Sequence, residues 1–278
     1  MMRVKGFTLI ELIIVIVLLA IVSTFTFRFV GIGAEMYAIG AERLKQLEQS
    51  RFAIERMTRE IRNAVPNSVR VTPSQPVNTT FQCLEFVPIK VAGTYYNAPF
   101  RKTDEKSLDF VSTADDWDDI TTEDRLFIYA TLPTWIYRNE NRFATVEQNT
   151  VRVDEHTPIT LNDDSLFAQR SPRQRLYVGN TPVSFCIEGD KLFRYEKYGW
   201  LAEQPEPNDF LPLNHKKSQI SSNLVNLINA PDSNKTSAFQ VERSVLRRSN
   251  VIHVFLEYRS RQQERLYYNH DIRIPNAP

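Results

Sequence analysis

The chain has 278 residues and a formal net charge of +1, with 34 basic and 33 acidic side chains. This balance leaves no overall field that would attract nucleic acid or an acidic substrate. Hydrophobic residues make up 42% of the chain and charged residues 24%, a composition typical of folded proteins and not of disordered ones. With only 8 glycines and 11% aromatic residues, the composition favours strands over a glycine-rich nucleotide-binding fold.

The first expected element is an apolar segment that follows a short basic leader, residues 1–6. The segment covers residues 7–32, roughly 39 Å as a helix, which is enough to span a bilayer. No clean small-residue cleavage site ends it, so it differs from an ordinary secretory signal. The positive charge of the leader predicts that it stays cytoplasmic and that the rest of the chain lies on the far side of the membrane.

One carboxylate, Glu11, lies inside this segment, where a charge costs about 2.5–3.5 kcal/mol. The stretch Lys5-Gly6-Phe7-Thr8-Leu9-Ile10-Glu11 resembles the prepilin signature of type IV pilins and type II secretion pseudopilins. The resemblance implies that a membrane aspartyl peptidase cleaves after Gly6 and methylates Phe7. It also implies that Glu11 faces the N-terminal amine of an adjacent subunit, where two buried charges neutralise each other and set the register.

The helix is expected to continue beyond the membrane as an amphipathic half over residues 33–65. Apolar side chains recur there at three- and four-residue steps: Leu44, Leu47, Ile54, Met57 and Ile61. Pro66 disfavours helical geometry at the residue before it, so the helix should end near Ala64. Related pilins often carry a proline where this chain has Arg28. Local melting would instead fall on the helix glycines, Gly31, Gly33 and Gly40.

Residues 66–278 predict a β-rich globular domain. Together with the helix they predict an α+β, pilin-like fold, in which the long N-terminal helix packs on a mainly antiparallel sheet. Short β-branched and aromatic segments give the expected strands, residues 82–91, 107–112, 125–132, 134–138 and 251–260. Residues 182–200 predict a hairpin that turns at residues 188–191. Two polar segments, residues 72–80 and 202–218, are expected to be loops.

The size of this domain and two local segments favour a minor subunit. Residues 49–71 and the hairpin with Phe185-Cys186 resemble the J/W group of minor pilins and pseudopilins, and within it the minor pilins of the mannose-sensitive haemagglutinin pilus. The resemblance implies a non-enzymatic role in pilus assembly, with prepilin peptidase, the major pilin, other minor pilins and the inner-membrane assembly platform as partners. It places the globular domain in the periplasm and later in the pilus. The alternatives are a J-like secretion pseudopilin, a tip adhesin or a DNA-uptake subunit.

The chain lacks the common catalytic and nucleotide-binding motifs, and its four histidines, His156, His215, His253 and His270, are scattered. No cofactor is therefore expected. Asp115, Asp116, Asp118 and Asp119 surround Trp117 and offer oxygen ligands for Ca²⁺, but they lack the glycine and distal glutamate of an EF-hand. A solvated loop is the favoured interpretation of these aspartates.

Two further groups of residues invite a binding interpretation. A basic patch for DNA would combine Arg170, Arg173, Arg175, Arg247 and Arg248. Ordinary surface charge explains these arginines better, and nucleic acid is not expected as a partner. Three tryptophans, Trp117, Trp135 and Trp200, would stack on sugars if they were exposed, although aromatic side chains more often lie in cores and interfaces.

The chain has two cysteines, Cys83 and Cys186. If the domain folds outside the cytoplasm, where thiols are oxidised, these two have no other partner, and a disulfide between them is predicted. Period-2 alternation places Cys186 on the strand face opposite Phe185, and Cys83 on the face opposite Leu84. Neither cysteine therefore resembles a simple core thiol, which is the alternative interpretation.

Overall fold

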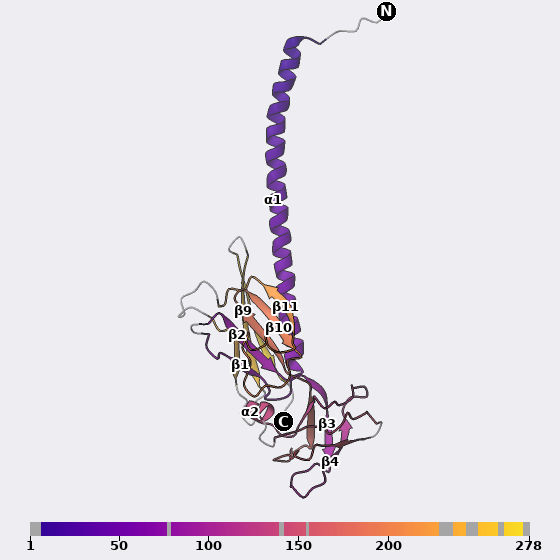
Figure 1. Ribbon diagram of the computed structural model, residues 1–278. Helices are drawn as coiled ribbons and strands as arrows, with labels where there is room; N and C mark the ends of the chain where they lie inside the picture. The colour runs from indigo at the N-terminus through magenta and orange to yellow at the C-terminus, as the bar shows by residue number, and fades with distance from the viewer. Residues whose placement is uncertain are drawn as a thin grey trace, which may run out of the picture. The chain divides into compact units, whose positions relative to one another are not determined.

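A computed structural model describes residues 7–76, 79–138, 142–153, 156–227, 236–242, 250–260 and 264–274. The chain divides into two compact units, Met1–Glu48 and Gln49–Pro278. The leader residues 1–6 lie outside the described residues, as do Arg247 and Arg248. The fold is α+β, a long N-terminal helix followed by antiparallel sheets (Figure 1).

The helix α1 runs without interruption over Leu9–Arg62, which is 54 residues. It ends two residues before the predicted position. Its last turn tightens, because the amides of Asn63 and Ala64 donate to the carbonyls three residues earlier, at 3.2 and 3.1 Å. No break occurs at Arg28 or at the helix glycines.

The first sheet has five antiparallel strands in the order β1-β2-β9-β10-β11 (Figure 1). Its strands are β1 (Arg70–Thr72), β2 (Phe81–Phe86), β9 (Val183–Glu188), β10 (Lys191–Glu196) and β11 (Lys216–Ser222). The predicted hairpin is the β9–β10 pair. Its turn contains Gly189 at φ +57°, a left-handed conformation that favours glycine.

A six-stranded antiparallel sheet is inserted between β2 and β9, in the order β6-β5-β8-β3-β4-β7. Its strands are β3 (Ile89–Tyr96), β4 (Ser107–Ser112), β5 (Arg125–Phe127), β6 (Phe143–Ala144), β7 (Thr157–Thr160) and β8 (Arg175–Gly179). The short helix α2 (Pro133–Tyr137) lies between β5 and β6. This whole region therefore leaves the first sheet at the end of β2 and returns at β9.

A third sheet, β12-β13-β14, closes the fold. Its strands are β12 (Phe239–Glu242), β13 (Val251–Arg259) and β14 (Arg265–Arg273). β13 alternates strictly between buried and half-buried side chains, and its buried residues Ile252, Val254, Leu256 and Tyr258 share one core with the first sheet. The end of α1 adds Ala53, Met57 and Ile61 to that core. Of the amphipathic stripe predicted for the helix, Met57 and Ile61 are thus buried and Ile54 packs against the core, whereas Leu44 is exposed.

Several strand predictions were wrong in detail. Residues 82–91 form two strands, β2 and β3, because the chain breaks at Val87-Pro88 and proline cannot donate to a ladder. Residues 134–138 belong to α2, where Pro133 sits in the first turn and its fixed φ suits a helix start. Of residues 125–132 only the first three pair as β5. β11 begins at Lys216, inside a segment expected to be a loop.

Candidate functional site

The start of α1 is fixed by a capping interaction. Thr8 precedes the helix, and its Oγ1 accepts a hydrogen bond from the Glu11 amide at 3.4 Å, while its carbonyl accepts from Leu12 at 3.2 Å. Thr8 and Glu11 have the spacing of a capping box, so the motif both begins the helix and places a carboxylate at its positive end. Within the part of the chain that the structure describes, the Glu11 carboxylate has no hydrogen-bond or ion-pair partner. Phe7 is 74% exposed, and Gly6 lies outside the described residues.

The apolar half of α1 leaves its side chains exposed. One helix of the described chain is long and apolar enough to cross a membrane, and its most apolar stretch is not buried. Even the polar side chains suit lipid, because the Thr24 and Thr26 hydroxyls donate to the Ala20 and Val22 carbonyls, both at 2.8 Å. This surface needs lipid or other apolar helices around it.

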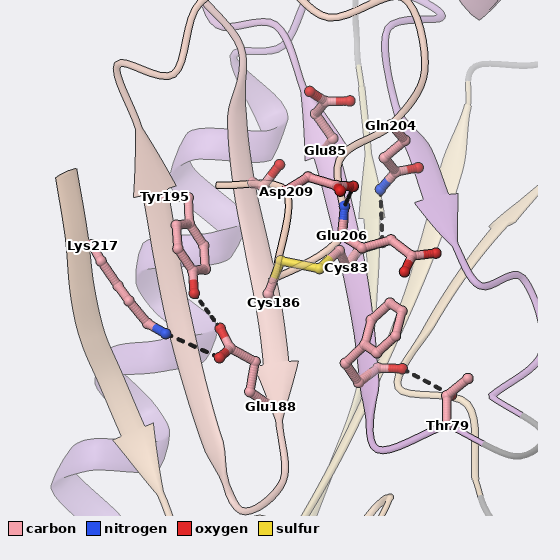
Figure 2. Close-up of a disulfide and its surroundings, with 12 residues drawn as sticks. Thr79, Cys83, Glu85, Cys186, Glu188, Tyr195, Gln204, Glu206, Asp209 and Lys217 are labelled. Atoms are coloured by element: carbon pink, nitrogen blue, oxygen red, sulfur yellow. Dashed lines mark hydrogen bonds and ion pairs between the residues drawn. A yellow bond between two sulfur atoms is a disulfide. The ribbon is translucent and has the colours of Figure 1, made fainter. Parts of the chain in front are cut away.

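The disulfide joins Cys83 on β2 to Cys186 on β9, two residues directly opposite each other in the ladder (Figure 2). Both cysteines are fully buried, although their face of the sheet is opposite to the main core. A second layer covers them, built from Tyr195 and from Tyr198 and Phe210 in the connection between β10 and β11. The first sheet is therefore buried on both faces, which the alternation of residues along the strands did not reveal.

A buried ion pair lies on the same face. Arg70 on β1 binds Glu85 on β2, and the carboxylate also accepts a hydrogen bond from the Tyr198 hydroxyl at 2.9 Å. Burial raises the pKa of Glu85, and the positive charge of Arg70 offsets part of that increase. Sequence analysis missed this pair, because it depends on the register that places Arg70 opposite Glu85.

Arg70 also holds the covering connection in place. Its guanidinium donates to the carbonyls of Leu201, Ala202 and Glu203 at 3.0, 2.7 and 3.1 Å, and it stacks on the Tyr137 ring at 3.6 Å. One cation thus joins β1, β2, α2 and the connection after β10. The role of Arg70 is structural, because its Nε, Nη1 and Nη2 atoms all bind groups of the protein itself.

The aspartates around Trp117 lie in a loop that the side chain and amide of Arg152 hold in place. Arg152 binds the Asp116 carboxylate at 2.9 Å and the Asp115 carbonyl at 2.7 Å, and its amide donates to Asp119 at 3.3 Å. Among the described residues, no group of three or more His, Cys, Asp or Glu side chains is placed to hold a metal ion. The structure therefore brings Arg152 to these aspartates, a neighbour that sequence analysis did not identify.

The three tryptophans, and Arg170 of the basic group, pack on neighbouring side chains. Trp117 packs edge-on against Phe110, Trp135 stacks with Arg142, and Trp200 lies against Arg125. None of the three tryptophans offers a fully exposed ring. Within the basic group, Arg170 lies over the Phe100 ring at 5.1 Å.

Comparison with known proteins locates one match. Residues 1–27 match the family model of the prokaryotic N-terminal methylation motif. No curated protein matches the chain, and no solved structure does. The motif and the exposed apolar helix together indicate membrane anchoring. The chain carries the N-terminal signal of type IV prepilins, joined to an α+β fold of pilin-like arrangement.

Proposed function

We propose that this chain is a minor subunit of a type IV pilus, assembled without covalent bonds from the inner membrane into the filament or its priming complex. The observation that supports this most strongly is the exposed apolar half of α1 directly after a prepilin signal. Prepilin peptidase would remove residues 1–6. The major pilin, other minor pilins and the assembly platform would then receive the apolar helix as it leaves lipid.

The assignment as a minor subunit, and not the major pilin, rests on the size of the globular region and on a resemblance to other minor pilins. The inserted six-stranded sheet makes the globular region larger than we expect of a major pilin, and the region resembles that of MshO, a minor pilin of the mannose-sensitive haemagglutinin pilus. Deletion of the gene separates the alternatives. We expect a strain without pili. Normal pili with lost adhesion or lost DNA uptake would favour an adhesin or uptake subunit, and normal pili with blocked protein secretion would favour a pseudopilin.

Processing gives a first prediction. Gly6→Arg should leave an unprocessed precursor in the inner membrane, because the peptidase would read the glycine just before the apolar segment. N-terminal sequencing and intact mass of the wild-type protein should give a methylated Phe7 as the first residue. A wild-type chain that begins near Thr24 or later would contradict the proposal.

Glu11 gives a second prediction. Glu11→Ala should insert normally, because it removes a charge that costs about 2.5–3.5 kcal/mol in the membrane. It should also enter filaments poorly, because the neighbour's amine loses its counter-charge. Thr8→Ala is a matched control that weakens the helix start and keeps the carboxylate. Immunoblots of membrane and sheared-filament fractions measure both effects, and equal defects in the two variants would mean that Glu11 acts only through the helix start.

A further inference from the structure

A groove of about 910 Å³ lies where the six-stranded sheet meets β9 and β10. Arg125 on β5 lines it from one side, and Lys197 and Trp200 line it from the segment that follows β10. Amide and hydroxyl side chains complete much of the wall: Thr122, Thr145, Asn180, Thr181 and Asn214. The groove serves no part of the assembly proposed above.

Arg125 is held rigidly at this groove. Its guanidinium carbon lies 3.9 Å from the centre of the Phe143 ring and 4.1 Å from that of Trp200, so an aromatic ring contacts it on two sides. Its Nη1 donates to the carbonyls of Ile136 and Tyr137 at 3.1 and 3.2 Å. The two hydrogen bonds use only Nη1. Together with the two rings, they fix the plane of the guanidinium.

The remaining N–H groups of Arg125 have no hydrogen-bond partner in the part of the chain that the structure describes. Within the described chain, Nε and Nη2 make no hydrogen bond. Neither atom is fully buried, so both are accessible from outside the protein. These two nitrogens form the side-on fork of a guanidinium, whose parallel N–H bonds match the two oxygens of a carboxylate. Arg125 thus presents a fork of fixed orientation.

Among the described residues, no carboxylate neutralises this cation. Arg125 forms no salt bridge within the described residues, and burial alone lowers its pKa, to about 10, so it remains charged at neutral pH. Lys197 on the same groove is exposed and makes no ion pair there either. Of the two glutamates that line the groove, Glu196 is already bound to Arg194 and Lys216. Glu123 is exposed to solvent. A half-buried cation without a counter-ion favours an anion from outside.

We propose that this groove binds an acidic sugar, with its carboxylate on the Arg125 fork and its hydroxyls on the amide and hydroxyl side chains of the wall. The fork matches the two oxygens of a carboxylate, and Lys197 adds a second positive charge. The wall presents amide and hydroxyl side chains to a polyhydroxylated ring. Those of Thr122 and Asn214 make no hydrogen bond within the described residues, whereas the Thr145 hydroxyl already accepts one from Asn162 and the Asn180 side-chain carbonyl accepts from Thr181. The volume admits a mono- or disaccharide.

The test uses the full processed chain in detergent micelles, with sodium glucuronate as the probe and methyl glucoside as the uncharged control. Saturation-transfer NMR titrations should show binding of glucuronate at least about tenfold tighter than that of the glucoside, and Arg125→Gln should abolish this difference. Arg125→Lys keeps the charge and loses the fork, so it should also lose most of the preference. Arg170→Gln, which removes a cation stacked on Phe100 outside the groove, should change nothing.

A second variant protects the test from misfolding of Arg125 mutants. Asn214 is exposed at the groove wall, so Asn214→Trp should place an indole in the groove and weaken glucuronate binding with an unchanged melting temperature. The proposal would be overturned if the wild type bound glucuronate and methyl glucoside equally, or bound neither. It would also be overturned if a folded Asn214→Trp protein bound glucuronate as well as the wild type does. Equal binding of N-acetylaspartate would overturn the assignment to a sugar and favour a carboxylate of another protein.

Discussion

Replacing Cys83, Cys186 or both by serine should lower the free energy of unfolding of the globular part by up to about 4.7 kcal/mol. The disulfide closes a loop with a sequence separation of 103, and losing it frees the unfolded chain of that constraint. The two single variants and the double variant should lose similar amounts, because each removes the same bond. Urea unfolding of the full chain in detergent, followed by tyrosine and tryptophan fluorescence, measures the difference.

Two controls make this result specific. The wild type after reduction should unfold at the urea concentration of the serine variants. The wild type unfolded without reductant and treated with an alkylating reagent should gain no alkyl group by intact mass. Two alkyl groups would show that the protein carries free thiols, and the predicted difference in stability would then have no basis.

Arg70→Met should destabilise the same region by about 3–5 kcal/mol, because it leaves Glu85 as an uncompensated buried carboxylate. It also removes the donor to three carbonyls of the connection that covers the disulfide. The double variant Arg70→Met, Glu85→Gln should recover part of the loss, since no charge then remains buried. Arg138→Met is a matched control, because its ion pair with Glu203 is exposed and should contribute less than about 1 kcal/mol.

The pH dependence of the Arg70→Met defect follows from the direction of the Glu85 pKa shift. The pKa is raised in the folded state, so the folded protein holds this proton more tightly than the unfolded chain does. The associated stability is present below the unfolded pKa, near 4.5, and is lost as pH rises through the folded pKa. Without Arg70 the folded pKa rises further, so the defect should be largest at neutral pH and shrink near pH 5. A defect that is constant from pH 8 to 5 would argue against a buried charge.

Local sequence rules account for the elements that were predicted well. β13 carries a strict alternation of buried and half-buried side chains, and the β9–β10 hairpin has a turn with glycine. The capping residue and the apolar segment that define the prepilin signal also lie within one short stretch. In each case the determining interactions connect residues close together in the chain.

The missed features depend on contacts between distant residues. The covering of Cys186 by Phe210 and the approach of Arg125 to Trp200 each bring together side chains that are far apart in sequence. The strand assigned to residues 134–138 had suitable aromatic and β-branched residues, yet Pro133 and the packing of Ile136 and Tyr137 favour a helix. Composition alone does not distinguish these outcomes.

The position of the disulfide has a mechanical consequence for a protein that is pulled by its ends. Tension from the N-terminal helix to the C-terminus would pass across the bond between β2 and β9 and bypass the inserted sheet. The two cysteines are separated by 103 positions in the sequence, so the disulfide shields about 350 Å of chain from extension. A single molecule stretched in an optical trap should therefore lengthen by about that much more after reduction. The inserted sheet, which includes Arg125, would keep its structure while the surrounding strands bear the load.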